Sequence, residues 1–168
     1  MAVYLLDANV FIEAKNRHYG FEFCPAFWDW LVRENITGRV ASVRKIAEEL
    51  QRGSDRLADW AKEQGEGFFL QPDDAVQKGL RTVIERVSEQ SFPQVEIAKF
   101  LQAGDCWLIA HALTHKGTVV THEKMQIDTL KVKIPNICNL LSLSCVDPFE
   151  MLNIEKARFV LSKYSITH

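Results

Sequence analysis

The stretch MAVYLLDANVFIEAK (residues 1–15) places a carboxylate, Asp7, directly after the apolar run at residues 3–6. A short apolar run of this kind is typical of a β-strand buried on both faces of a sheet. A second polar side chain, Asn9, follows two positions later. An acid in this place either caps the next turn or helix, or belongs to a site at the carboxyl end of the strand. The rest of the sequence has to distinguish the two.

The pattern of apolar residues predicts short strands that alternate with amphipathic helices along the whole chain. Strands are expected at residues 3–6, 38–43, 68–70, 118–121 and 144–146, and helical segments at 11–15, 25–32, 43–53, 54–61, 72–91, 95–101, 105–116, 134–141 and from 148 onward. Ser42 is the expected N-cap of the helix over 43–53. This alternation favours an α/β fold with a mainly parallel sheet.

Length and composition limit the classes of protein. The 168 residues are most simply one domain, and 47% hydrophobic with 25% charged residues is ordinary for a globular protein. A formal charge of −2 excludes a uniformly basic nucleic-acid coat. No apolar run approaches the ~20 residues that span a bilayer, and the first residues lack the pattern of a signal peptide, so we expect a cytoplasmic protein without membrane segments.

The four cysteines are widely spaced and include no Cys-x-x-Cys pair. In a reducing compartment such residues behave as small buried hydrophobic side chains. We therefore expect neither disulfides nor a structural zinc site.

Acidic residues recur at positions where an α/β fold builds sites. Ligands bind at the carboxyl ends of parallel strands. Asp7 ends the first strand, and Glu123 follows the strand at 118–121 by two residues. Asp105 begins the helix that leads into that strand, and Glu49 lies on the helix after the second strand. We expect these four acids to converge on one rim of the sheet.

Four carboxylates in one place repel one another, so some must take up protons or a cation must neutralise them. A cluster of oxygen ligands without imidazole or thiolate suits Mg²⁺ or Mn²⁺. Such an ion activates water and stabilises the charge that develops on a phosphodiester. The pattern therefore indicates hydrolysis of a nucleic-acid backbone.

Each acid also has a simpler interpretation. Glu48 and Glu49 are neighbours, but Glu49 lies beside the apolar stripe of its helix, so we favour Glu49 as the site residue. Asp105 alone could be an ordinary acid in the first turn of a helix. Glu123 could pair with Lys124 in a surface loop.

Four motifs together resemble the PIN domain of VapC-type toxin nucleases. They are LLDANVFI (residues 5–12), IAEEL (46–50), GDCWLIAHAL (104–113) and VVTHEK (119–124), in the family's order. The stretch at 119–138 is similar to one uncharacterised PIN-like subgroup in particular. The resemblance covers nearly the whole chain, with little motif between residues 60 and 101.

The resemblance implies a single PIN-like domain over residues 1–168, folded as a Rossmann-like three-layer α/β/α sandwich. It implies a metal-dependent endoribonuclease, usually the toxin of a toxin–antitoxin pair, with RNA as substrate and a cognate antitoxin as partner. Asp7, Glu49, Asp105 and Glu123 would be the catalytic and metal-binding acids. Asn9 would fill the polar position after Asp7, and Asn9 and Thr121 would orient ligands or water by hydrogen bonds.

Two departures from the family pattern leave an alternative open. The fourth acid is usually an aspartate in Thr-x-Asp, whereas this chain has Glu123 after Thr121, and Asp128 is a second candidate for the role. An aromatic residue that often closes the motif is replaced by Met125. The alternative is a catalytically degenerate PIN-like module that binds protein or RNA.

Other side chains invite rival interpretations. His111 and His115 have the i, i+4 spacing of a zinc site, but no further ligand is obvious, and an ordinary histidine pair is favoured. Trp60 and Trp107 lie on predicted helices and suit core or interface positions better than base stacking. A basic group on or near the Glu49 helix could steer phosphates or be a solvated face; its members are Arg39, Arg44, Lys45, Arg52 and Arg56. PIN relatives often form homodimers, and the pair Phe27/Trp30 is the predicted surface for one.

Other enzymes with an acid after the first strand fit less well. A phosphatase with an aspartate nucleophile has a second aspartate where this chain has Asn9. A receiver domain has an acidic pair before the phosphorylated aspartate, and a dinucleotide-binding fold has glycines after the first strand. None of these features is present in the sequence.

Overall fold

The computed structural model describes residues 4–161 and confirms the predicted α/β fold. Its sheet contains five strands, all parallel to their neighbours, in the order β3-β2-β1-β4-β5. The strands are β1 (Tyr4–Leu6), β2 (Val40–Val43), β3 (Phe69–Leu70), β4 (Thr118–Val120) and β5 (Cys145–Val146). Each lies within a range predicted from the apolar pattern.

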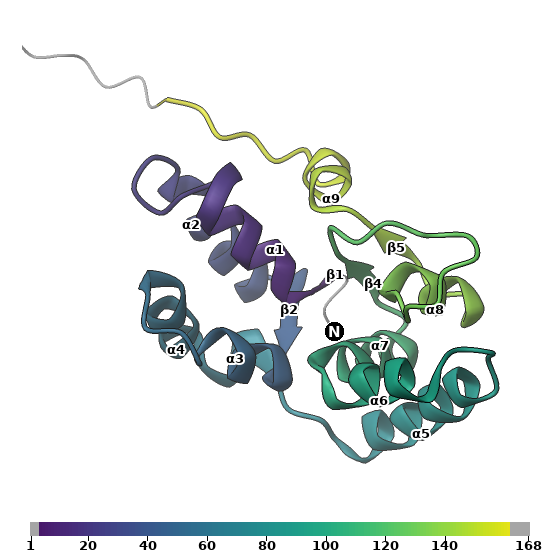
Figure 1. The fold of residues 1–168 in the computed structure, drawn as a ribbon. Coiled ribbons are helices and arrows are strands. Elements are labelled where there is room, and N and C mark those ends of the chain that lie inside the picture. The colour runs from purple at the N-terminus through teal and green to yellow at the C-terminus, as the bar shows by residue number, and fades with distance from the viewer. Residues whose placement is uncertain (1–3, 162–168) are drawn as a thin grey trace, which may run out of the picture.

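Helices cover both faces of this sheet (Figure 1). The first group comprises α1 (Ala8–Glu13), the π-helical turn η1 (Ala14–His18), α2 (Pro25–Ile36), α3 (Arg44–Leu50) and α4 (Arg56–Phe68). The second comprises α5 (Asp74–Ser88), α6 (Gln94–Gln102), α7 (Gly104–His115) and α8 (Ile134–Leu140), and α9 (Pro148–Ile154) follows β5. Right-handed crossovers would place the two groups on opposite faces, because the chain passes from β1 to β3 in one direction and from β3 through β4 to β5 in the other.

The centre of the sheet is buried from both sides. All residues of β1 and β2 are buried, as a parallel sheet with two covered faces requires. Helix α7 packs across β1, β2 and β4, while α2 and α4 pack on β2. This is the three-layer arrangement that was expected.

An aromatic cluster fills the layer between α2, α4 and the sheet. The ring of Phe11 lies 5.7 Å from that of Trp60, and Trp28 lies 5.0 Å from Trp60. Trp28, Trp30 and Trp60 are at most 5% exposed, so they are core residues, as the sequence favoured for Trp60. Trp107 on α7 is half-buried.

The predicted dimer surface at Phe27 and Trp30 is wrong. Phe27 is fully buried and Trp30 is 5% exposed. Phe27 stacks on Tyr19 at 4.4 Å and contacts the ring of Phe159 from the C-terminal segment edge-on. Helix α2 is therefore enclosed on more than one side, by the chain that precedes it and the chain that follows α9, which periodicity within α2 does not reveal.

The predicted N-cap at Ser42 is also wrong. Ser42 belongs to β2, and its hydroxyl donates a 2.6 Å hydrogen bond to the carbonyl oxygen of Leu6 in the neighbouring strand. Val43 holds the N-cap position of α3 without a side-chain hydrogen bond. The serine thus joins the ends of β2 and β1.

Between residues 4 and 161, no helix combines the length and the apolar character that crossing a bilayer demands. The four cysteines are free thiols, as expected.

Candidate active site

The candidate site lies at the point where the strand order reverses. Strands β1 and β4 are neighbours, but the chain leaves them toward opposite edges of the sheet. Such a switch point opens a crevice beyond the carboxyl ends of the two strands, which is the usual place for a ligand in an open α/β sheet. Asp7 follows β1 and Thr121 follows β4, so both lie at this end of the sheet. The backbone N–H of Asp7 donates to the carbonyl oxygen of Val120 at 2.9 Å, which fixes the register of the two strand ends.

Asp7 caps α1 and is also hydrogen-bonded to Thr121 at the end of β4. Its Oδ1 accepts a 2.7 Å hydrogen bond from the backbone N–H of Ala8 at the start of α1, and its Oδ2 accepts one of 2.8 Å from the hydroxyl of Thr121. The side chain is held from both strands and the residue is only 4% exposed. The two interpretations of the opening motif are therefore compatible.

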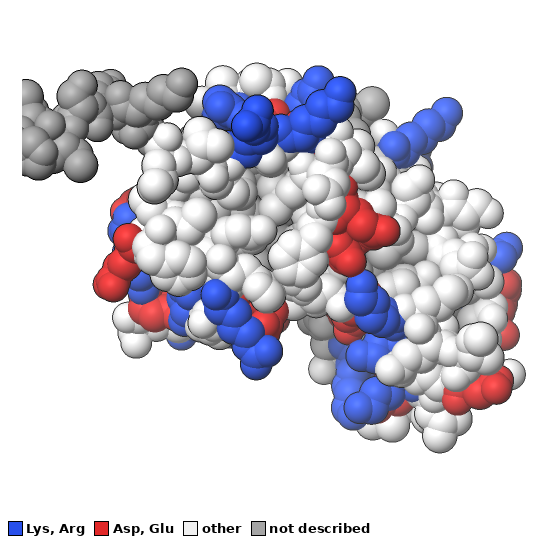
Figure 2. All heavy atoms as spheres, turned by 90° about the horizontal axis from the view of Figure 1, so that it is seen from above, with Lys and Arg blue, Asp and Glu red and all other residues white. Residues whose placement is uncertain are grey.

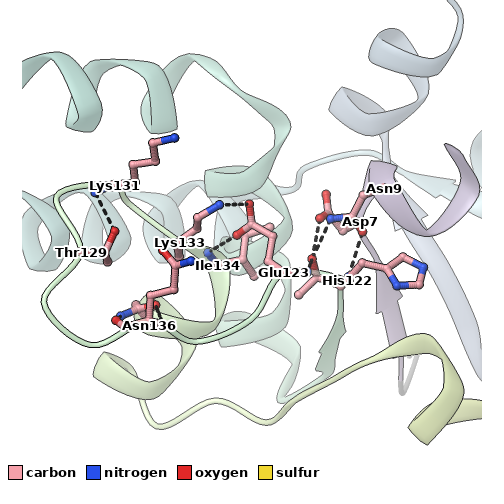
Figure 3. A network of polar contacts seen from close by, with 11 residues as sticks. Asp7, Asn9, His122, Glu123, Thr129, Lys131, Lys133, Ile134 and Asn136 are labelled. Carbon is pink, nitrogen blue, oxygen red and sulfur yellow. Dashed lines mark hydrogen bonds and ion pairs between the residues drawn. The ribbon is translucent and has the colours of Figure 1, made fainter. Parts of the chain in front are cut away.

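Asn9 and Thr121 form a polar network around Asp7 (Figure 3). The Asn9 amide donates to Thr121 Oγ1 at 3.0 Å, and its Oδ1 accepts from the backbone N–H of His122 at 3.0 Å. Thr121 Oγ1 also accepts from the backbone N–H of Glu123 at 3.1 Å. This network holds the Asp7 carboxylate and the first residues after β4 in one arrangement.

Asp105 and Glu49 reach the same region from two helices. Asp105 lies in the first turn of α7, and the neighbouring Gly104 packs closely on Ile46 of α3. A Cβ atom at Gly104 would lie 2.7 Å from Ile46 Cδ1, so only glycine allows this approach without a shift. Glu49 follows Ile46 by three residues on the same helix, and its charge acts on Asp105.

The structure also separates Glu49 from its neighbour Glu48. The carboxylate of Glu48 pairs with Arg44 at 3.1 Å and with Lys45 at 2.9 Å on the helix surface. Glu49 is exposed and raises the pKa of Asp105. Of the two, Glu49 is therefore the one that belongs to the acidic region.

Burial and mutual repulsion perturb the two central acids. Burial is the main cause that raises the pKa of Asp7 to about 7, the charge of Asp105 raises it further, and Glu123 adds a smaller effect. The hydrogen bonds from Thr121 and Ala8 oppose this rise. Burial likewise raises the pKa of Asp105 to about 6, followed by the charges of Glu123 and Glu49. Strongly perturbed acids in a crevice are a signature of functional sites.

Glu123 faces away from Asp7 in this arrangement (Figure 3). Its Oε1 lies 3.4 Å from the ammonium of Lys133, and its Oε2 accepts a 2.8 Å hydrogen bond from the backbone N–H of Ile134. The alternative pairing with Lys124 is absent from the described residues, because Lys124 pairs with Asp147 at 2.9 Å. Asp128 lies exposed in the loop before α8 with a left-handed φ of 57°.

The donor chemistry of these acids fits a divalent cation, but they are not assembled to hold one. Carboxylate oxygens in a half-buried crevice are the ligands that Mg²⁺ and Mn²⁺ prefer, and their repulsion favours a cation. Within residues 4–161, however, no three His, Cys, Asp or Glu side chains lie close enough together to hold an ion at once. Binding would therefore require side-chain rotation, first of all by Glu123, whose oxygens contact Lys133 and Ile134.

The histidine pair on α7 lies away from this crevice. His111 is 2% exposed, and its ring lies 6.1 Å from that of His115. Burial, with a smaller contribution from the charge of His115, lowers the pKa of His111 to about 4. Within residues 4–161 this pair belongs to no group of three side chains that could hold a metal ion, and the buried Nδ1 of His111 has no hydrogen-bond partner there.

The predicted basic group is mostly engaged in surface ion pairs. Arg39 pairs with Glu155, Arg44 and Lys45 pair with Glu48, and Arg56 pairs with Glu63. Figure 2 shows acidic and basic side chains interspersed on one face of the molecule. These contacts favour the solvated face over a dedicated phosphate channel.

Two residues important to the site were not identified from the sequence. From the sequence, Gly104 was interpreted only as a break before the helix that became α7. In the structure, its close packing on Ile46 brings α3 and α7 together. Lys133, beside Glu123, carried no motif. Its position directly before the Ile-Pro start of α8 was the one available signal.

Comparison with curated protein sequences finds no match. Among solved structures, the "Crystal structure of VapBC2 from Rickettsia felis bound to a DNA fragment from their promoter" is similar, with a TM-score of 0.48 and 15% identity over 86% of this chain and 97% of that chain. Residues 4–159 match the family described as "Domain of unknown function (DUF4411)", and the chain belongs to that family.

Proposed function

We propose that this protein is a divalent-metal-dependent endoribonuclease of PIN type that hydrolyses RNA phosphodiester bonds. The observation that carries the proposal is the convergence of acids from separate parts of the chain on one crevice, where the pKa values of Asp7 and Asp105 are raised to about 7 and 6. Glu123 and Glu49 contribute to this repulsion. A bound divalent cation would relieve it.

In this proposal Asp7, Glu49, Asp105 and Glu123 hold Mg²⁺ or Mn²⁺. When bound, the ion supplies an activated water and stabilises the charge on the phosphodiester. The chain's own residues orient the ligands. Thr121 and Asn9 fix the Asp7 carboxylate through the hydrogen bonds described above.

We further propose that the protein is the toxin of a toxin–antitoxin pair. The support is the set of PIN-type motifs at 5–12, 46–50, 104–113 and 119–124. RNA is then the substrate, and a cognate antitoxin is the protein partner. A homodimer remains an expectation of the family resemblance, without the Phe27/Trp30 surface.

The test is cleavage of end-labelled RNA by the purified protein with Mn²⁺ or Mg²⁺ and again with EDTA. We expect cleavage by the wild type that EDTA abolishes. Asp105→Asn should cut the RNA at least about 100-fold more slowly. Equal cutting by wild type and variant would identify a contaminating nuclease and remove the support for the proposal.

One observation favours the second candidate, a PIN-like module that binds RNA or protein without cleaving it. The carboxylate of Glu123 is engaged with Lys133 and Ile134, and no three acids of the described residues are assembled to hold an ion. Thermal stability separates the two functions. If Mn²⁺ raises the melting temperature and Asp7→Asn abolishes this rise, the nuclease is supported. If Mn²⁺ leaves the melting temperature unchanged, the binding module is supported.

A further inference from the structure

Lys133 and Ile134 together hold both carboxylate oxygens of Glu123. The Lys133 ammonium lies 3.4 Å from Oε1, and the Ile134 N–H donates to Oε2 at 2.8 Å (Figure 3). The two contacts come from adjacent residues at the start of α8. Glu123 is thereby turned from the crevice toward the basic side chain.

The Lys133–Glu123 pair differs from the lysine–acid pairs on the surface. The side chains of Lys133 and Glu123 are 26% and 25% exposed, against 67% and 19% for Lys99 and Glu96 and 73% and 20% for Lys124 and Asp147. Less solvent around a charge means weaker screening. The charge of Lys133 is therefore less screened than the charges of Lys99 and Lys124.

The positive charge of Lys133 acts on the acidic crevice as well as on Glu123. It lowers the pKa of Asp105, in opposition to the charges of Glu123 and Glu49 that raise it. Lys133 therefore lies within electrostatic reach of two of the acids. It neutralises part of the repulsion that the crevice contains.

We propose that Lys133 is an intramolecular counter-ion of the acidic site and competes with the divalent cation for Glu123. In the metal-free protein the ammonium and the Ile134 N–H hold the glutamate. Metal loading then requires Glu123 to leave both partners and turn toward Asp7 and Asp105. The competition with the metal rests on the proposed function, whereas the counter-ion role in the metal-free protein does not.

The competition is tested by calorimetric titration of the full chain with Mn²⁺ at pH 7. Lys133→Met keeps the apolar length of the side chain and removes its charge. We expect it to bind Mn²⁺ about tenfold more tightly than the wild type, and Lys133→Arg to bind like the wild type. The matched control is Lys131→Met, an exposed lysine two residues earlier, which should leave the affinity unchanged. Unchanged or weaker binding by Lys133→Met would overturn the competition.

A second measurement tests the counter-ion without any metal. Melting temperatures in EDTA are compared for the wild type, Lys133→Met, Glu123→Gln and the double variant. Because Gln can still accept the Ile134 hydrogen bond, the cycle isolates the charge pair. We expect Lys133→Met to lower the melting temperature when it is introduced into the wild-type protein. Introduced into the Glu123→Gln protein, it should lower the melting temperature by less than half as much.

Each experiment can overturn its part of the proposal independently of the other. Equal losses of melting temperature in both backgrounds would overturn the counter-ion role, whatever the metal does. If neither the wild type nor Lys133→Met binds Mn²⁺, the metal site of the proposed function and the competition both fall, while the coupling in EDTA still decides the role of Lys133 in the metal-free protein.

Discussion

The hydroxyl of Thr121 donates a 2.8 Å hydrogen bond to Oδ2 of Asp7, joining two residues that are 114 positions apart in the chain. The bond links the ends of β1 and β4 at the point where the strand order reverses. It lowers the pKa of a carboxyl group that burial and Asp105 raise. The charge state of the site therefore depends on the contact between these two strands.

Removing the Thr121 hydroxyl should destabilise the protein and raise the pKa of Asp7 further. Thr121→Val keeps the shape of the side chain but leaves Asp7 Oδ2 without its donor, at a cost of about 1–3 kcal/mol. Chemical denaturation measures the loss, and NMR titration measures the carboxyl pKa. Thr121→Ser is the control and should restore most of both, whereas equal losses in the two variants would mean that the methyl group, not the hydroxyl, is what matters.

The two adjacent glutamates of α3 should differ sharply in their effects. Glu49→Gln removes a charge that raises the pKa of Asp105, so it should lower this pKa and slow RNA cleavage by about 100-fold. Glu48→Gln is the matched control, because Glu48 pairs with Arg44 and Lys45 on the surface. Similar cleavage rates for the two variants would remove Glu49 from the proposed site.

The stability of the metal-free protein should fall as the pH rises through the titration of Asp105. Its pKa is about 6 in the folded protein against an ordinary value of 3.8, so the folded state holds a proton that the unfolded chain has released. The stabilisation is present below pH ~4 and is lost by pH ~7, by about 3 kcal/mol. Denaturation in EDTA across this range should show a flatter profile for Asp105→Asn, and parallel profiles would contradict the perturbed pKa.

Addition of Mn²⁺ should reverse the sign of this dependence. Metal ligands bind in their deprotonated form, so stabilisation by the ion grows as Asp105 and Asp7 ionise between about pH 6 and 8. Melting curves with and without Mn²⁺ at several pH values measure it. A stabilisation that is the same at every pH would place the ion away from these acids.

His111 should cause a loss of stability at acid pH. Its folded pKa of about 4 lies below the ordinary 6.5, so protons favour the unfolded state as the pH falls through that interval. His111→Leu removes this effect, of about 3 kcal/mol, together with a buried Nδ1 that has no hydrogen-bond partner among residues 4–161. Denaturation at pH 4.5 should find the variant more stable than the wild type, and His115→Leu serves as the comparison.

The sequence predicted the fold well because its signals were local. Short apolar strands, proline at the start of α2, α8 and α9, and an acid after β1 and in the first turn of α7 are each visible within a few residues. The parallel order of the strands follows from the alternation of strands and helices. The predictions that were wrong concerned residues whose position depends on contacts between segments distant in the sequence.

Three cases show this dependence. Phe27 and Trp30 are enclosed partly by segments outside α2, among them the chain near Phe159, which no pattern within α2 indicates. Ser42 bonds the Leu6 carbonyl across the sheet instead of capping α3. Glu123 follows β4 as predicted, but the contact with Lys133 that turns it away is set by the loop before α8.

The central claim is that Asp7 and Asp105 share one divalent cation. The most direct measurement is X-ray diffraction from crystals soaked in Mn²⁺, recorded where manganese scatters anomalously. We predict an anomalous peak bounded by the carboxylates of Asp7 and Asp105, with Glu123 rotated away from Lys133 toward the ion. An empty crevice in crystals that bind Mn²⁺ elsewhere, or not at all, would contradict it.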